Sequence, residues 1–250
     1  MQNSAPRFAV IGGTGLNTWA DLNIERYQTV TTPFGEPSAP LAHGTLHGAR
    51  VVFLPRHGQG HKLPPHLINY RANLDALKQA GVSAVIGVAA VGAIADWFVP
   101  GEIALPDDLI DYTWGRAHSY ADGRPEAGVQ HVEMTQPYHP ELRARLIQAA
   151  AQAGVPFAGN GVMAVTQGPR LETAAEIRRL KRDGADMVGM TGMPEASLAA
   201  ELGLQYASLA VSVNWGAGVK GLGDIHAEIE QSINKGMAKV RAVLAALAKL

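Results

Sequence analysis

The chain has no cysteine among its 250 residues. This absence excludes disulfide bonds, thiolate metal sites and cysteine nucleophiles. Aromatic residues are scarce at 6%, and charged residues reach only 17% against 47% hydrophobic residues, a balance typical of a compact globular protein. The formal net charge of −1 provides no broad attraction to nucleic acid, so no nucleic-acid partner is expected.

Long hydrophobic runs are also missing. No stretch reaches the roughly eighteen apolar residues of a membrane span, so no membrane association is expected. The opening residues, MQNSAPRFAVIGG, lack the charged start and apolar core of a signal peptide, and we expect a cytoplasmic location. Because no repeat or linker divides the chain, residues 1–250 are expected to form a single domain.

Short apolar runs alternate with helical patterns along the whole chain. The predicted strands are residues 8–11, 50–54, 82–88, 161–166, 187–190 and 206–213, and residues 101–105 and 107–110 bracket a further strand or short turn. The predicted helices are residues 69–80, 141–153, 174–183, 194–203 and 225–250, and residues 113–137 form a long irregular excursion. This alternation predicts an α/β domain with a central mixed, mainly parallel sheet flanked by helices.

The strand Tyr206–Val213 is composed of small and β-branched residues and is followed directly by an amide, Asn214. Ligands of open α/β sheets lie beyond the carboxyl ends of such strands, so Asn214 is well placed to read hydrogen bonds on a ligand. The alternative is that Asn214 begins a turn through Trp215–Gly218, because Asn and Gly favour turns.

Three further strand ends carry anion-binding groups. The loop Gly12–Gly15 offers backbone amides and the Thr14 hydroxyl, Arg56 and His57 follow a second strand, and Thr191 precedes a helix. With almost no carboxylates nearby, these donors together predict a phosphate pocket. Taken singly, each has an ordinary alternative, such as a tight turn or a surface arginine beside a packed histidine.

Two other chemistries find little support. His57, His61 and His66 are close in sequence, but Pro64-Pro65 prevents a regular helical face, and no HExxH motif occurs. We therefore expect no metal site. A serine hydrolase is not indicated either, because no GxSxG motif is present. Glu172 follows a predicted strand and is a candidate functional residue only if it shares a pocket with Asn214. The alternative is an acid that the helix dipole favours near a helix start.

Five ordered motifs resemble the trimeric nucleoside phosphorylase family, which includes methylthioadenosine phosphorylases and their 6-oxopurine relatives. The motifs are GGTGL at Gly12–Leu16, RHG at Arg56–Gly58, NYRANLDALK at Asn69–Lys78, QGPRLET at Gln167–Thr173 and MTGMPEA at Met190–Ala196. The resemblance covers essentially the whole chain. It implies a distorted, barrel-like sheet, a homotrimer, and phosphorolysis of a nucleoside to a purine and a pentose 1-phosphate. It also implies that inorganic phosphate is a co-substrate and that no metal or organic cofactor is needed.

The resemblance assigns roles to residues of this chain. Those assigned to phosphate are Thr14, Arg56, His57, Thr191 and the backbone amide of Ala90. Met190 would lie against the ribose, and Glu172 and Asn214 would be the base-binding and catalytic residues. Those placed around the 5′ substituent are His61, His131, Leu222, Ile225 and His226. In adenosine-type relatives a threonine stands where this chain has Ala89, so one hydroxyl contact to phosphate is expected to be missing.

The hydrogen-bonding groups predict which purine is cleaved. An ionised Glu172 only accepts, so it suits the N1–H of a 6-oxopurine and not the lone pair of adenine N1. The amide of Asn214 can donate to O6 and accept from a protonated N7. Methylthioadenosine phosphorylases resemble this chain but carry Asp at the positions of Asn214 and Gly216. A 6-oxopurine, hypoxanthine or guanine, is therefore expected.

The 5′ substituent is less clearly indicated. Leu222 and Ile225 favour an apolar methylthio group, whereas His226 favours a hydroxyl unless it is a helix-start residue facing solvent. The expected reaction is phosphorolysis of S-methyl-5′-thioinosine to hypoxanthine and 5-methylthioribose 1-phosphate. The alternatives are an inosine/guanosine phosphorylase, a methylthioadenosine phosphorylase, and a non-catalytic nucleotide-binding protein on the same fold.

Overall fold

A computed structural model describes residues 7–16, 19–121, 123, 128–220 and 225–250, with only the backbone of residues 225–228. The strands are β1 (Phe8–Gly12), β2 (Asn23–Gln28), β3 (Leu41–Leu46), β4 (Ala49–Pro55), β5 (Ala84–Ala93), β6 (Ile103–Ala104), β7 (Asp108–Asp111), β8 (Val162–Val165), β9 (Met187–Gly189) and β10 (Gln205–Trp215). The helices are α1 (Tyr70–Gln79), α2 (Pro140–Gln152), α3 (Ala174–Arg182), α4 (Gly192–Glu201) and α5 (Ile225–Leu247).

All of these strands join one mixed sheet, in the order β2-β3-β4-β1-β5-β9-β8-β7, with β10 paired to β5 and β6. The pairings of β1 with β4 and β5, of β5 with β10, and of β8 with β7 and β9 are parallel. The prediction of an α/β protein with a mixed sheet between helices is confirmed. Within the described residues the sheet is open, so its barrel-like curvature does not close.

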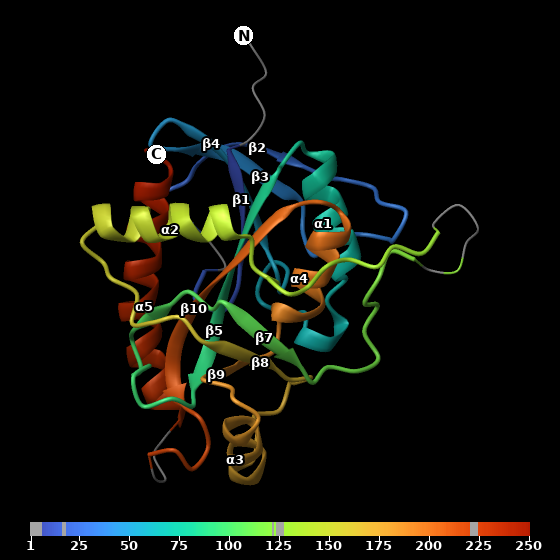
Figure 1. Cartoon of the computed structure of the whole chain (residues 1–250). Helices are drawn as coiled ribbons and strands as arrows, with labels where there is room; N and C mark the ends of the chain where they lie inside the picture. Colours follow the sequence, from blue (N-terminus) through green and yellow to red (C-terminus); the bar gives the residue numbers. More distant parts are fainter. Residues whose placement is uncertain (1–6, 17–18, 122, 124–127, 221–224) are drawn as a thin grey trace.

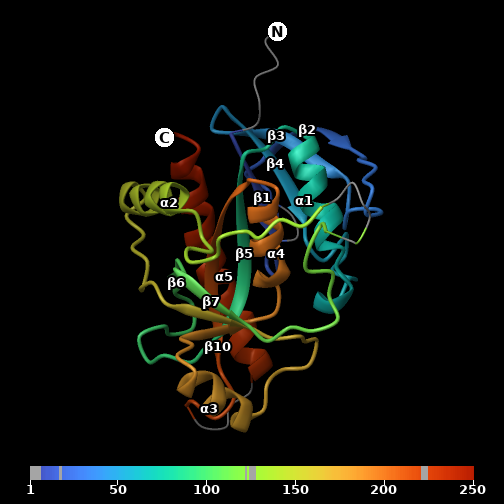
Figure 2. The ribbon, with the colours of Figure 1, turned by 45° about the vertical axis from the view of Figure 1, so that its right-hand side comes forward.

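Helices cover both faces of the sheet. In Figures 1 and 2, α2 and α5 lie together on one side and α1 and α4 on the other, while α3 stands at the end near β9. Successive side chains of a strand point to opposite faces. In β1, Phe8 and Val10 therefore enter the core beneath α5, whereas Ala9 and Ile11 enter the core beneath α1 and α4. Every residue of β1 is buried, because both faces of the strand are covered. This explains its uninterrupted apolar sequence.

The structure differs from the predicted elements in three places. The hairpin β2–β3 was not predicted, because β2 (NIERYQ) is polar and almost entirely exposed at the sheet edge. Strand β5 continues to Ala93, past its predicted end at Val88, since its small residues pair with β10 along nearly its whole length. Strand β10 likewise continues to Trp215 and contains Asn214, which we expected at the strand end.

The lengths and hydropathies of the helices test the expectation that the chain has no membrane span. Within the described ranges, no helix is both long and apolar enough to cross a membrane.

Candidate active site

A cavity of about 600 Å³ opens at the carboxyl ends of β1, β4, β5, β8, β9 and β10. This is where ligands of α/β sheets bind. The cavity gathers nine of the residues to which sequence analysis gave a role. They are Thr14, Arg56, His57, His61, Ala90, Glu172, Met190, Thr191 and Asn214. The three strand ends with anion-binding groups therefore converge, although the role of each residue remains a prediction.

The loop after β1 brings backbone amides against the end of β5. A Cβ atom on Gly13 would lie 2.5 Å from the carbonyl oxygen of Val88 and 2.9 Å from Nη1 of Arg56, so a side chain does not fit there. The turn is closed by a hydrogen bond from the Leu16 amide to the Gly13 carbonyl (3.0 Å). Thr14, at the tip of this turn, lines the cavity. The glycines thus allow the turn to approach the site closely.

The edge of β5 offers a backbone amide at Ala90. β1 pairs with β5 only as far as Gly87. Beyond Gly87, the backbone groups on this edge of β5 form no hydrogen bonds with β1. The Val88 carbonyl points to this edge, where it accepts from Nη1 of Arg56 (2.7 Å). Residues two apart on a strand direct their N–H and C=O groups to the same side. The Ala90 N–H therefore points toward the cavity, as a phosphate-binding amide requires.

Arg56 is held by a carboxylate that sequence analysis did not anticipate. Its Nε and Nη2 each donate to Glu195 at 2.7 Å, and both residues are only 1% exposed. Burial acts to lower the pKa of Arg56, but the charge and hydrogen bonds of Glu195 raise it overall. Tyr206 adds a hydrogen bond from its hydroxyl to Glu195 (2.7 Å). The expectation of a site almost free of carboxylates is therefore wrong at this point.

His57 is a neutral side chain at physiological pH. Burial lowers its pKa to about 4, with the charge of Arg56 acting in the same direction. Its Nδ1 donates to the Leu63 carbonyl at 2.8 Å, because a carbonyl oxygen only accepts. The other ring nitrogen, Nε2, is then an acceptor. Such a nitrogen suits the P–OH of hydrogen phosphate and not a fully deprotonated oxygen.

Thr191 is the residue before the first turn of α4. It is 7% exposed and lines the cavity, yet its side chain makes no capping hydrogen bond to the helix. The hydroxyl oxygen of a threonine in this position commonly accepts a hydrogen bond from a backbone amide of the helix. At this site the helix does not use the hydroxyl, and Thr191 lines the cavity beside Met190.

The loop after β8 carries Glu172, which lines the same cavity. The hydroxyl of Thr166 donates to Oε1 of Glu172 at 2.6 Å. Since the carboxylate accepts this bond, its remaining lone pairs are available to a ligand donor. The residues Thr166 and Glu172 thus form an oriented acceptor.

Asn214 reaches the cavity through an irregularity in β10. The register of β10 against β5 shifts between Ser212 and Asn214, which leaves Val213 as an extra residue. As a result Val213 and Asn214 both line the cavity, although neighbouring residues of a regular strand point to opposite faces. Nδ2 of Asn214 donates to the carbonyl of Trp215 (2.7 Å), which orients its Oδ1 away from that carbonyl.

The residues predicted around the 5′ substituent are not all brought together. His61 lines the cavity, with its ring 4.2 Å from that of His57. His131 is exposed and is not part of the lining in the described single chain. Leu222 and the side chains of Ile225 and His226 lie outside the described residues. The apolar wall that the structure does show consists of Leu63, Pro64, Pro65, Pro169, Leu171 and Ile229.

The histidines that the structure describes do not gather into a metal centre. In the portion of the chain that the structure describes, no group of three or more His, Asp or Glu side chains is arranged to hold a metal ion. His66, the third histidine considered for such a site, is not among the cavity residues.

Sequence analysis gave no role to several residues of the site. Glu195 belongs to the MTGMPEA motif and to the predicted helix of residues 194–203, and nothing in the sequence around Thr166 indicates its contact with Glu172. Lys62 and Ile229 also line the cavity. Glu195 lies in α4, six residues before its end. Its carboxylate is a signal in the sequence for a buried ion pair, because an acid inside an apolar helix needs a buried partner.

Comparison with known proteins identifies the family of the chain. A sequence model of the Phosphorylase superfamily matches residues 7–249. The chain therefore belongs to the phosphorylase superfamily. Its structure is similar to methylthioadenosine phosphorylase from Schistosoma mansoni in complex with adenine, with a TM-score of 0.90 and 32% identity over 98% of this chain and 91% of that one.

The curated relatives are nucleoside phosphorylases, a narrower class of enzyme than the superfamily. A protein named probable S-methyl-5′-thioinosine phosphorylase, from Pseudomonas syringae pv. tomato, is 52% identical over 239 residues, 95% of this chain and 96% of the relative. The 6-oxopurine nucleoside phosphorylase from Pyrococcus furiosus is 42% identical over 247 residues, 97% of this chain and 92% of the relative. The prediction of a nucleoside phosphorylase, an enzyme, is confirmed.

Proposed function

We propose that the enzyme cleaves S-methyl-5′-thioinosine with inorganic phosphate, giving hypoxanthine and 5-methylthioribose 1-phosphate. The observation that carries the 6-oxopurine part is that Glu172 and Asn214 line one cavity, together with Gly216. The curated relatives named for thioinosine and 6-oxopurine nucleosides support the same choice.

Donor and acceptor positions decide the base. Glu172 already accepts from Thr166 and is available to accept the N1–H of a 6-oxopurine. Adenine offers a lone pair at N1 instead, which faces the carboxylate unfavourably. Asn214 adds an amide that accepts from N7–H and donates toward O6. A site built to pair such groups rejects a base with reversed groups by several powers of ten.

Apolar residues of the cavity support the methylthio group. Leu63, Pro64, Pro65 and Ile229 line the cavity and give it an apolar wall. Burial of a methylthio group against such a wall is favourable, whereas a 5′-hydroxyl there needs a polar partner. His61, which also lines the cavity, is a polar side chain that the resemblance places near the 5′ substituent. Inosine and guanosine, which carry that hydroxyl, are therefore the second candidate substrates.

The chemistry requires no covalent enzyme intermediate. A phosphate oxygen bonds to C1′ as the C1′–N9 bond breaks, and the electron pair of that bond passes to the purine. The proton lost by hydrogen phosphate ends on N7 of the purine, and this N7–H donates to Oδ1 of Asn214. Glu172 and Asn214 act where the base gains negative charge, and the bound phosphate faces the cationic sugar. In many enzymes, stabilisation of developing charge contributes more to the rate enhancement than any other effect.

The test is a comparison of kcat/KM for methylthioinosine, inosine, guanosine and methylthioadenosine with phosphate present. We expect methylthioinosine to be the best substrate and to yield free base only when phosphate is added. If methylthioadenosine is best, the proposed reading of the base is wrong. If no purine nucleoside is cleaved at high enzyme concentration, the phosphorylase function itself fails.

Three further properties belong to this proposal. By family resemblance we propose a homotrimer, located in the cytoplasm. Light scattering coupled to size-exclusion chromatography measures the assembly. We also propose that no cofactor is needed beyond the co-substrate phosphate, so prolonged dialysis against EDTA is expected to leave kcat unchanged. A loss restored by added metal would contradict this.

A further inference from the structure

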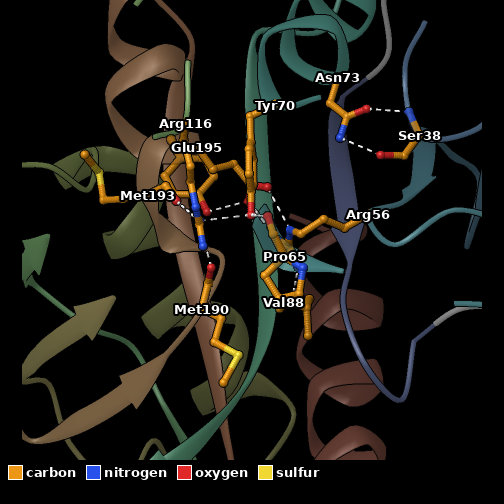
Figure 3. A network of polar contacts seen from close by, with 11 residues as sticks. Ser38, Arg56, Pro65, Tyr70, Asn73, Val88, Arg116, Met190, Met193 and Glu195 are labelled. Atoms are coloured by element: carbon orange, nitrogen blue, oxygen red, sulfur yellow. Dashed lines mark hydrogen bonds and ion pairs between the residues drawn. The ribbon is translucent and has the colours of Figure 1, made fainter. Parts of the chain in front are cut away.

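Arg116 joins the backbone segments that carry the base and sugar sites. It belongs to the irregular excursion of residues 113–137 and does not line the cavity described above. All three guanidinium nitrogens nevertheless donate to groups directly behind the cavity wall. Figure 3 shows its side chain beside Tyr70, with the carbonyl groups of Met190 and Met193 directed at it.

On one side, Arg116 holds the turn between β9 and α4. Nη1 donates to the carbonyl of Met190 at 2.9 Å and to that of Met193 at 2.6 Å. Thr191, which contributes the phosphate-facing hydroxyl, lies between these two residues. The position of this turn therefore depends on a planar group that reaches both of its carbonyls.

On the other side, Arg116 holds the start of the loop that bears Glu172. Nη2 donates to the carbonyls of Gln167 (2.8 Å) and Thr166 (3.3 Å), and Nε donates to Oε1 of Gln167 (3.2 Å). The same Thr166 donates its hydroxyl to Glu172 at 2.6 Å. Arg116, which lies outside the cavity, thus connects the loop that bears Glu172 with the turn that bears Met190 and Thr191.

A third segment is linked through Tyr70. Nη1 of Arg116 donates to the Tyr70 hydroxyl (3.2 Å), which in turn donates to the Pro65 carbonyl (2.9 Å). Pro65 lies in the segment after His57 and lines the cavity. Only a forked, planar guanidinium presents donors in these several directions at once, so lysine is not an equivalent replacement.

We propose that Arg116 is a positioning residue, which sets the distance between the base-reading Glu172 and the Met190–Thr191 turn. The inference rests on the phosphorolysis proposed above. Displacement of reacting groups by about 1 Å costs roughly 100-fold in rate. We therefore expect Arg116→Ala to lower kcat about 100-fold and to raise the KM for phosphate several-fold. Arg116→Lys is expected to behave almost as poorly.

The decisive measurement is chemical rescue. Methylguanidinium at millimolar concentration is expected to restore kcat of Arg116→Ala at least tenfold, whereas tetramethylammonium at equal ionic strength restores nothing. Arg178→Ala, on the exposed face of α3, is the matched control and should resemble wild type. A mere loss of folded enzyme lowers apparent kcat without changing the KM for phosphate and is visible as a lowered melting temperature. If the alanine variant does not fold, kcat and the KM for phosphate are measured in Arg116→Gln and Arg116→Lys, and unchanged values in both folded variants contradict the positioning role.

The outcomes separate this inference from the proposed function. Each variant is assayed on the nucleoside that wild type cleaves best. Wild type without activity on any purine nucleoside contradicts the proposed function. An active wild type with a folded Arg116→Ala of equal kcat and KM contradicts the positioning role, as does an impaired variant that methylguanidinium stabilises without restoring turnover.

Discussion

The guanidinium of Arg56 and the carboxylate of Glu195 form a two-point ion pair in the interior, with Nε–Oε2 and Nη2–Oε1 both at 2.7 Å. This pair sets the direction of an arginine whose third contact is the Val88 carbonyl. These bonds use three of its five N–H groups among the described residues, so two remain for phosphate. The pair also offsets the arginine charge. Anion binding at this site must therefore depend on directed donors as much as on net charge.

Glu195→Gln is predicted to weaken both stability and phosphate binding. The substitution leaves a buried arginine without its counter-charge, which typically costs about 3 kcal/mol or more. Urea unfolding should show this loss, and the KM for phosphate should rise about tenfold because Arg56 is no longer held in one direction. Glu230→Gln, an exposed carboxylate on α5, serves as control. Unchanged phosphate KM in a folded Glu195→Gln enzyme would show that the pair does not position Arg56 for phosphate.

His57 predicts a specific loss of stability in acid. Burial lowers its pKa to about 4 in the folded protein, against about 6.5 when unfolded. Between these values the unfolded chain binds a proton that the folded chain does not. Stability from His57 is thus present above pH 6.5 and is lost as the pH falls toward 4, with a slope approaching about 1.4 kcal/mol per pH unit.

The measurement is the free energy of unfolding in urea from about pH 7 to about pH 4.5, which spans most of the interval between the two pKa values. His57→Gln cannot take up the proton, so its curve should be flatter than that of wild type in this range. Burial and two nearby arginines also lower the pKa of His43, so the comparison with His43→Gln separates the two histidines. Parallel curves for wild type and His57→Gln are the result that the structure does not allow.

Asn214→Asp is predicted to change base preference. A carboxylate there accepts from the 6-amino group of adenine but repels O6 of hypoxanthine. The ratio of kcat/KM for methylthioadenosine to that for methylthioinosine should rise roughly 100-fold or more. Asn23→Asp, on the exposed edge strand β2, controls for added charge. An unchanged ratio means that Asn214 does not select the base. Gly216→Asp is less suitable, since its Cβ would lie 3.1 Å from the Ala93 carbonyl.

Thr166→Val is predicted to lower kcat about tenfold with little change in fold. Valine has nearly the same shape but cannot donate to Glu172, so the carboxylate loses the 2.6 Å bond that orients it. Steady-state kinetics on methylthioinosine is the assay, and Thr135→Val, an exposed threonine, is the control. Equal kcat in the two variants would exclude an orienting role for the Thr166 hydroxyl.

Much of the fold was predictable because its signals are local. The uninterrupted apolar run of β1 and the glycine-rich turn after it indicated a buried strand ending at a ligand site; in the structure the strand is buried and the turn lines the cavity. The same reasoning missed β2, whose NIERYQ sequence shows no buried face. That strand forms because β3 offers a free edge, a condition that exists only once the sheet has assembled.

Residue identities and spacings by themselves determined an α/β protein, the family motifs, and a set of donors and acceptors suited to phosphate and a 6-oxopurine. Tertiary structure decided how those groups are held. The bulge that turns Asn214 into the cavity, the burial of Glu195 against Arg56, and the carbonyls gathered around Arg116 all join segments far apart in sequence. Such contacts depend on packing and on the pairing of every buried polar group, and neither is written in the pattern of any single segment.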